Sequence, residues 1–294
     1  MKNYHPISII IIVVVLSCIN LSAQKIDSIP SVCLNHILIY LDSATYQNLF
    51  NSSFLSDTIG DCESHTVTTD KQKYSGKYLF GEEGYLEFFS TKKVNTIPSG
   101  TFGLGFITFR TGDIWKIRNE WQKHTTETIW TDTTFKFDKG LRESWYYSIG
   151  IDSKDTTKYY PIWLMENTPE HMYKVGYTNT DLKEVISWGT YHRKLRNSEP
   201  FSKLLKGITS VNISVDNDGL DFLKKNLQGF GLRMIGTTFL NQFVDILSDI
   251  KPCYIWRIQT ITFELKQDVA YRKLIISDNL ILELEGKSAV MTFN

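Results

Sequence analysis

The chain has 294 residues, with 32 basic and 32 acidic side chains. This balance, without a basic patch, argues against nucleic acid and anionic membrane surfaces as partners. Aromatic residues make up 13% of the chain, which suits a β-rich protein with a large core, and the length allows two compact domains or one large one.

Residues 1–23 have the pattern of a signal peptide. Lys2 supplies a positive start, 7–16 form a short apolar run, and Leu21-Ser22-Ala23 offers a cleavage site. The run is too short to cross a bilayer, which takes about 20 residues. We therefore predict an exported, periplasmic or extracellular protein without a transmembrane span. One alternative stays open: Val15-Leu16-Ser17-Cys18 resembles a bacterial lipobox, in which Cys18 carries a lipid anchor.

Three cysteines, Cys33, Cys62 and Cys253, remain after such cleavage. No pair has the spacing of a cysteine-based zinc site. In an oxidising compartment Cys33 and Cys62 could form a disulfide, and otherwise all three are buried or free thiols.

The first predicted unit covers residues 34–90. A strand at 34–41 is rich in β-branched and aromatic residues, and Asp42 or Ser43 caps a helix with an apolar stripe of Tyr46, Leu49 and Phe50. Strands at 63–69, 74–80 and 85–89 follow, the last two joined by a glycine-bounded turn at 81–84.

Alternation places His36, Leu38 and Tyr40 on one face of the first strand, opposite the helix. On the last strand Glu87 shares a face with Tyr85 and Phe89. Burying a carboxylate between two aromatic residues is costly unless it has a partner, so we predict that His36 and Glu87 meet.

This β-α-β-β-β order, with a His in its first strand and a Glu in its last, resembles the vicinal oxygen chelate superfamily of glyoxalases, extradiol dioxygenases and bleomycin-resistance proteins. The strings Leu-Asp-Ser-Ala-Thr-Tyr, Gly-Lys-Tyr-Leu-Phe-Gly and Tyr-Leu-Glu are similar to an uncharacterised bacterial family of unknown function. The resemblance covers residues 32–167. It implies a cleft between paired modules, with His36 and Glu87 as ligands of a divalent metal ion.

A second unit at 99–167 repeats the pattern. A strand at 102–109 precedes a cap at Thr111-Gly112-Asp113, a helix with Ile114, Ile117 and Trp121 on one face, and strands at 128–137, 144–151 and 159–166. Aligning Arg110 with Asp42 places Leu104 at the position of His36, so this copy lacks the histidine. The ligand set that the resemblance implies is then His36 and Glu87, to which Glu166 could be added, with Glu166 also as a catalytic carboxylate. The missing histidine argues equally for a metal-free cleft, unless His171 replaces it.

The remaining chain divides into a connector at 168–206 and a C-terminal α+β module at 207–294. The connector either crosses the cleft or links domains. The module starts with a strand at 208–215, in which Ser210 takes the place of His36, and a helix capped by Asp218. A second helix is predicted at 239–250, followed by strands at 255–265, 271–277, 280–284 and 289–293. We predict a third, divergent β-α-β module.

Three functions remain open for this α+β chain of paired modules. The first is a metal-free protein that binds a small molecule in an aromatic cleft lined by Tyr40, Tyr85, Phe89 and Phe106. The second is a divalent-metal enzyme of the lyase, isomerase or dioxygenase type, using His36 and Glu87. The third is a structural or interaction protein of the cell envelope.

Overall fold

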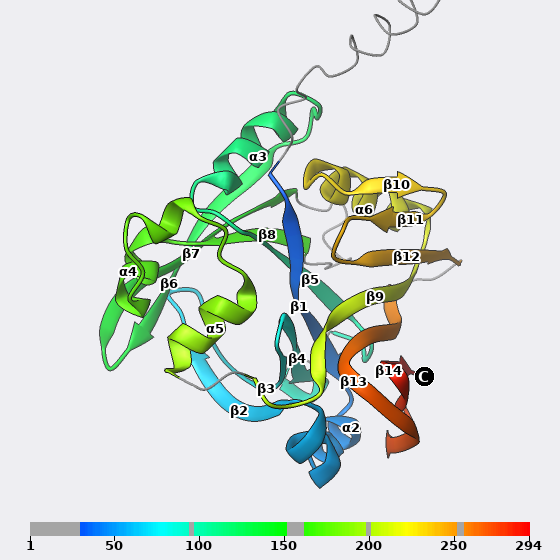
Figure 1. The fold of residues 1–294 in the computed structure, drawn as a ribbon. Coiled ribbons are helices and arrows are strands. Elements are labelled where there is room, and N and C mark those ends of the chain that lie inside the picture. The colour runs from blue at the N-terminus through cyan, green and yellow to red at the C-terminus, as the bar shows by residue number, and fades with distance from the viewer. Residues whose placement is uncertain (1–29, 94–96, 152–161, 198–200, 252–255) are drawn as a thin grey trace, which may run out of the picture.

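The computed structural model describes residues 30–93, 97–151, 162–197, 201–251 and 256–294. This part of the chain forms an eight-stranded and a six-stranded sheet, with helices between them and over the larger one (Figure 1). It contains no helix long and apolar enough to cross a membrane.

The first module has the predicted β-α-β-β-β order. Asp42 caps the helix, because its carboxylate accepts hydrogen bonds from the amides of Ala44 and Thr45 at 3.0 and 2.9 Å. The elements are β1 (Val32–Leu41), α2 (Ser43–Asn48), β2 (Asp61–Thr68), β3 (Lys73–Gly81) and β4 (Gly84–Ser90). Strand β1 pairs in parallel with β4.

The second module repeats this order and joins the first through the antiparallel pair β1–β5. Its elements are β5 (Phe102–Thr108), α3 (Asp113–Gln122), β6 (Ile129–Asp138), β7 (Leu141–Ile151) and β8 (Ile162–Asn167). The strand order of the large sheet is β2-β3-β4-β1-β5-β8-β7-β6, so the two modules are arranged symmetrically about the central pair.

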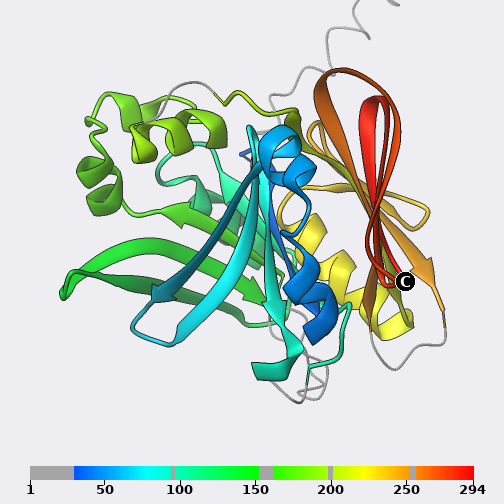
Figure 2. The ribbon, with the colours of Figure 1, turned by 90° about the horizontal axis from the view of Figure 1, so that it is seen from below.

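The two edges of the large sheet meet, so the sheet curls into a nearly closed trough. Thr69 and Lys136 form an antiparallel bridge, and the amide of Asp70 donates to the carbonyl of Phe135 at 3.0 Å. Lys71 adds a hydrogen bond to Thr134 at 2.8 Å. The edge hairpins β2–β3 and β6–β7 project on the same side of the molecule (Figure 2).

The C-terminal part contains the predicted third β-α-β module. Its elements are β9 (Leu205–Val215), α6 (Asn217–Gly229), β10 (Arg233–Ile235), β11 (Thr238–Leu240), β12 (Asp245–Ile250), β13 (Arg257–Ser277) and β14 (Leu280–Phe293). The strand order β10-β11-β12-β9 corresponds to β2-β3-β4-β1 in the first module. Strands β12 and β9 pair in parallel, as β4 and β1 do. Strand β13 pairs antiparallel with β9, as β5 does with β1.

Three expectations for this module were wrong. The helix predicted at 239–250 is two strands, β11 and β12, because Phe239 and Ile246 point into the core by strand alternation. The four predicted C-terminal strands merge into the single long hairpin β13–β14. Helix α6 is capped by Asp216 rather than Asp218, with the Gly219 amide 2.8 Å from its carboxylate.

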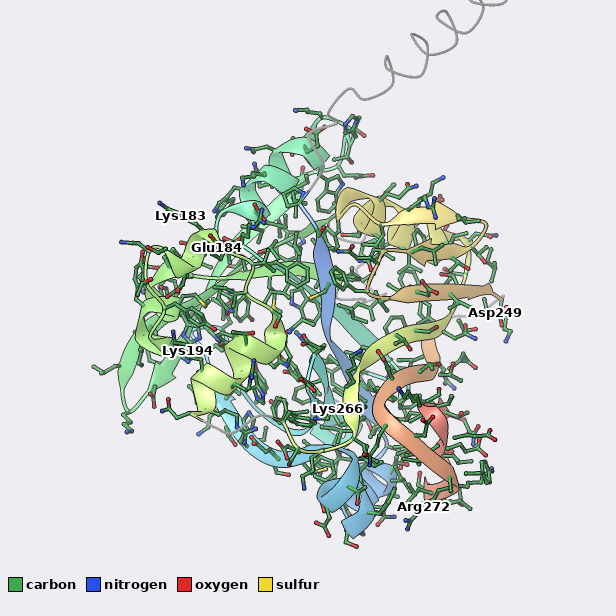
Figure 3. The ribbon with its side chains drawn as sticks, in the orientation of Figure 1. Lys183, Glu184, Lys194, Asp249, Lys266 and Arg272 are labelled. Carbon is green, nitrogen blue, oxygen red and sulfur yellow. The ribbon has the colours of Figure 1, made fainter. Side chains whose placement is uncertain are left out.

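The connector contains α4 (Pro169–Val175) and α5 (Trp188–Arg196), which lie over the concave face of the large sheet (Figure 1). Trp188 stacks on Tyr85 with ring centroids 4.9 Å apart, and His192 stacks on Phe80 at 5.0 Å. We call these two helices and the turn between them the roof. Lys183, Glu184 and Lys194 belong to it (Figure 3).

One apolar core joins both sheets. It contains Ile37 and Ile39 of β1, Trp121 of α3 and Val211 of β9, each at most 4% exposed. Helix α6 lies against the large sheet, because the side-chain oxygen of Asn226 accepts from the amide of Ile151 at 3.2 Å. The helices α2, α3 and α6 thus share the space between the sheets, which leaves the concave face of the large sheet for the roof and the site.

Cys33 and Cys62 are free thiols in this fold. Burial raises the pKa of each to about 12, so neither is a reactive thiolate at neutral pH. Cys253 lies outside the described residues.

Candidate functional site

The concave face of the large sheet, which we call the inner face, is lined by aromatic residues around one carboxylate. The β1–β4 register pairs His36 with Tyr85, Leu38 with Glu87 and Tyr40 with Phe89, so these six side chains share a face. Strand β3 pairs Tyr78 with Glu87 and adds Tyr78 and Tyr74 to the same face. Across the trough, β8 contributes Trp163 and β7 contributes Tyr146.

His36 is packed as a neutral ring. It is 4% exposed, stacks on Tyr85 at 4.8 Å and meets the edge of Trp163 at 5.3 Å. Its Nδ1 lies 3.0 Å from the side-chain oxygen of Asn35, a contact between sequence neighbours that the bulge in β1 permits. Burial penalises the imidazolium and lowers the pKa of His36 to about 3.

Gly105 makes room for this ring. It faces His36 across the β1–β5 pair, and a Cβ atom at this position would lie 2.3 Å from the imidazole Cε1. In the second module the inner-face position is therefore a glycine. The alignment of Leu104 with His36 was out by one residue, because it matched Arg110 with Asp42, whereas the β1–β5 register places Gly105 opposite His36. Leu104 points into the core and is fully buried.

Glu87 is the ionisable group at the centre of the inner face. Tyr85 donates a hydrogen bond to its carboxylate, yet burial prevails and raises its pKa to about 7. Burial raises the pKa of Tyr74, Tyr78 and Tyr146, and the charge of Glu87 raises each of these pKa values further. No cationic side chain of the described residues forms an ion pair with it. A carboxyl that titrates near neutral pH suits proton transfer or charge recognition.

The structure gives His36 and Glu87 different partners. Because Leu38 is the residue opposite Glu87, the two groups are offset by two positions along parallel strands, about 7 Å. His36 contacts Asn35 and Tyr85, whereas Glu87 accepts from Tyr85. The predicted contact between His36 and Glu87 is absent from the described structure, and Tyr85 instead contacts both residues.

Two other predicted site residues lie on the opposite face of the sheet. Glu166 is 3% exposed and caps α3: it accepts from Thr108 Oγ1 at 2.9 Å and from the amides of Gly112 and Ile114 at 2.6 and 2.9 Å. Phe106 is fully buried in the core, with its ring 5.6 Å from that of Phe230. Both point away from Glu87, because β5 and β8 turn their even-numbered positions to the helices.

These placements do not fit a divalent metal ion. His36 is enclosed by rings, Glu87 is offset from it, and Glu166 serves a helix on the other face. Within the described ranges no three His, Cys, Asp or Glu side chains are grouped as metal ligands. A catalytic metal site normally needs three protein ligands.

His171 belongs to a hydrogen-bonded chain that fastens the roof. Its Nδ1 lies 2.7 Å from Glu143 Oε1, and its Nε2 lies 2.8 Å from the hydroxyl of Tyr191. Tyr191 also bonds the side chain of Trp145, and Lys174 reaches Glu143. The chain therefore ties α4 and α5 to β7. It occupies both ring nitrogens of His171, the residue considered as a substitute ligand.

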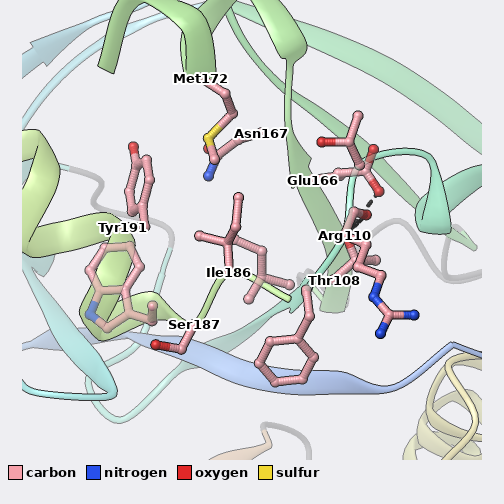
Figure 4. Close-up of a pocket in the computed structure, with 12 residues that line it drawn as sticks. Thr108, Arg110, Glu166, Asn167, Met172, Ile186, Ser187 and Tyr191 are labelled. Carbon is pink, nitrogen blue, oxygen red and sulfur yellow. Dashed lines mark hydrogen bonds between the residues drawn. The ribbon is translucent and has the colours of Figure 1, made fainter. Parts of the chain in front are cut away.

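A small cavity lies at the seam between the roof and the β5–α3 loop (Figure 4). It measures about 30 Å³, which holds one or two water molecules but not a substrate. Figure 4 shows Glu166 bonded to Thr108 beside it, with Asn167, Met172 and Tyr191 among the lining residues. The half-buried stretch of inner face around Glu87 is the better candidate site.

Sequence reasoning missed Tyr74, Tyr78 and Tyr146 as members of this site, although it identified Tyr40, Tyr85 and Phe89. Alternation along 74–80 places the first two on one face. Nothing local places Tyr146 beside them, because that depends on closure of the sheet.

The paired modules, with β1–β4 and β5–β8 parallel around an antiparallel centre, define the class of fold: paired βαβββ modules of the vicinal-oxygen-chelate type, followed by a third module. The fold class predicted from the sequence is confirmed. The chain belongs to a family of unknown function (DUF5829), whose model matches residues 34–293.

Several solved structures are similar to this chain. A hypothetical protein from Staphylococcus aureus is 13% identical, with a TM-score of 0.53, over 86% of this chain and 98% of the other. More distant matches include a homoprotocatechuate 2,3-dioxygenase from Brevibacterium fuscum (12% identity, TM-score 0.37, 78% of this chain and 64% of the other). An Mn(II)-bound glyoxalase from Novosphingobium aromaticivorans has 9% identity and a TM-score of 0.36, over 76% and 62% of the two chains. No curated protein matches the sequence significantly.

Proposed function

We propose that this chain is an exported protein that binds a small molecule on the inner face of its large sheet, without a resident metal ion. The observation that carries the proposal is Glu87, a carboxyl held among tyrosines with no cationic partner in the described structure. Such a convergence of aromatic surface and one polar group is typical of small-molecule sites.

The exposed part of the inner face supports this proposal. The roof stacks on Tyr85 and Phe80, and Phe80 is 8% exposed, whereas Tyr40, Glu87 and Phe89 stay only half-buried. A ligand can therefore reach Glu87 while the roof holds the other end of the trough shut. The enzyme alternative has less support, because His36, Glu87 and Glu166 do not converge.

A ligand-detected NMR screen of small polar and aromatic fragments tests the binding proposal. We expect a set of fragments that compete with one another and lose affinity in Glu87→Gln. Tyr173→Phe is the control, because its hydroxyl lies on the outside of α4 and bonds only to Asn179 there. If no fragment binds, or if every hit binds equally to Glu87→Gln, the proposal fails.

Export is a separate part of the proposal and rests on the sequence of residues 1–23. The expected mature chain begins at Gln24 or, in the lipoprotein form, at a lipidated Cys18. Intact-mass measurement of the protein from its native cells distinguishes these forms. An N-terminus that retains residues 1–23 would contradict export by this route.

A further inference from the structure

We propose that the inner face around Glu87 is a binding site for a small organic cation, an amine or a quaternary ammonium compound. This inference rests on the proposed small-molecule function and names its ligand class. Tyr78 of β3 lies opposite Glu87, Tyr85 of β4 bonds the carboxylate, and Tyr74 of β3 and Tyr146 of β7 lie on the same inner face.

The first argument is charge. A desolvated carboxylate is costly without a counter-charge, and Glu87 has only the Tyr85 hydrogen bond to offset that cost. A cationic ligand would supply the missing charge. An anionic ligand would be repelled, and a neutral one would leave the carboxylate uncompensated.

The protein's own cations on the sheet are engaged elsewhere. Lys77 of β3 donates to the carbonyls of Tyr46 and Gln47 at 2.7 and 3.1 Å, on the α2 side of the sheet. Lys71 pairs with Asp132, and Lys136 lies 3.8 Å from Glu143. In the described part of the chain, none of these three lysines forms an ion pair with Glu87.

The second argument is the aromatic surface. The negative faces of aromatic rings attract ammonium groups, most strongly where water is excluded, and rings around a quaternary ammonium form the familiar aromatic cage. Tyr74 and Tyr40 both contact Phe89, with ring centroids 5.7 and 5.8 Å apart, so the aromatic surface continues beyond the four tyrosines. This surface therefore offers aromatic rings to a cationic ligand and, among the described residues, no positively charged side chain that would repel it.

Glu87 is the group of this site that titrates near neutral pH. Burial lowers the pKa of His36 on β1 and of His65 on β2, whose ring stacks on Tyr78 with centroids 4.0 Å apart, which favours their neutral forms. The tyrosines on β3, β4 and β7 stay neutral because their pKa values are raised. Below pH 7 Glu87 takes up a proton and the site loses its charge. Affinity for a cation should then be about tenfold weaker at pH 6 than at pH 8.

The experiment compares choline with dimethylbutanol, in which carbon replaces the charged nitrogen, by titration calorimetry and NMR at pH 6 and 8. We expect choline to bind at least tenfold more tightly than dimethylbutanol at pH 8. Glu87→Gln should remove that preference and its pH dependence. Glu184→Gln, an exposed carboxylate of the roof, is the matched control.

Two outcomes separate this inference from the proposed function. If dimethylbutanol or an anionic fragment binds as tightly as choline, or if Glu87→Gln keeps the preference, the cation class is wrong while a small-molecule site survives. If choline, tetramethylammonium and the whole fragment set fail to bind at millimolar concentration, both proposals are overturned. Glu87→Gln removes a half-buried charge that has no cationic partner in the described chain, so the variant should fold.

Discussion

At the scale of single residues, Glu87 should make the stability of the protein depend on pH. Its pKa is about 7 in the folded chain against 4.5 ordinarily, so the folded state binds its proton more tightly. The contribution of Glu87 to the free energy of unfolding is therefore greatest below pH 4.5. It falls by about 2–3 kcal/mol as the pH rises to 7.

The variant Glu87→Gln should flatten this slope and be more stable than the parent at pH 8, by about 2 kcal/mol, because no charge is buried. Urea denaturation at pH 5 and pH 8 measures the difference. Glu184→Gln provides the control for loss of an exposed carboxylate. Equal slopes for parent and Glu87→Gln would show that Glu87 does not titrate in this window.

A second prediction at this scale concerns the close approach of Gly105 to His36. In Gly105→Ala the new methyl group meets the imidazole at 2.3–2.8 Å, and the surrounding rings leave the imidazole little room to move. Overpacking of this kind costs about 1–3 kcal/mol.

The double variant His36→Ala/Gly105→Ala tests the cause, because the space left by the imidazole accepts the methyl group. We expect Gly105→Ala to cost less in the His36→Ala background than in the parent. A double-mutant cycle by urea denaturation measures this coupling. A coupling energy near zero would mean that Gly105 matters for another reason.

At the scale of elements, the chain Glu143–His171–Tyr191 decides how firmly the roof is held. Tyr191→Phe removes the hydroxyl that bonds His171 and Trp145, so a buried imidazole nitrogen loses its partner. This should cost about 1–3 kcal/mol. Hydrogen exchange should accelerate in α5 and stay unchanged in β1 and β4.

The control for the roof is Tyr173→Phe on α4, which loses a hydroxyl bonded to Asn179 on the outside of the helix. In Tyr173→Phe the backbone amides of α5 should exchange hydrogen at the same rates as in the parent protein. If Tyr191→Phe exchanges like Tyr173→Phe, the hydrogen-bonded chain does not hold the roof, and packing of Trp188 on Tyr85 carries the contact.

Elements with a clear local signal were predicted well, and elements decided by the partner strand were not. The Asp42 cap and the alternation of β1 are local, and both are confirmed. In 239–250, by contrast, Phe243, Leu247 and Ile250 fit a helical spacing, yet all three are at least 38% exposed. Pairing of β12 with β9 overrides that spacing, because it satisfies a whole ladder of backbone groups.

In the candidate site, too, the features set by local sequence were predicted and those set by strand pairing were not. Alternation within β1 and β4 correctly groups His36, Tyr40, Tyr85, Glu87 and Phe89 on one face. It cannot give the parallel register, which separates His36 from Glu87 by two positions. Glu166, which the resemblance suggested, lies one residue beyond the inner-face position of β8, and a shift of one residue moves a side chain to the other face of a strand.

At the scale of the whole molecule, the shared core predicts that both sheets unfold together. The apolar core runs without a break from β1 through α3 and α6 to β9, so neither sheet can bury its helix side alone. Calorimetry should give one transition, with equal calorimetric and van't Hoff enthalpies. Two resolved transitions would show that the third module is an independent domain.

The contact between α6 and α3 is where this coupling can be weakened. In Gly229→Ala the new methyl group would lie 2.2 Å from the Trp121 ring, and the ring is only 4% exposed. We expect a loss of about 1–3 kcal/mol in the free energy of unfolding. Hydrogen exchange should show β1 and β9 losing protection together at lower denaturant concentration. Gln228→Ala, an exposed neighbour on α6, should change neither strand. Early loss of protection in β9 alone would mean that the six-stranded sheet can open while the trough stays folded.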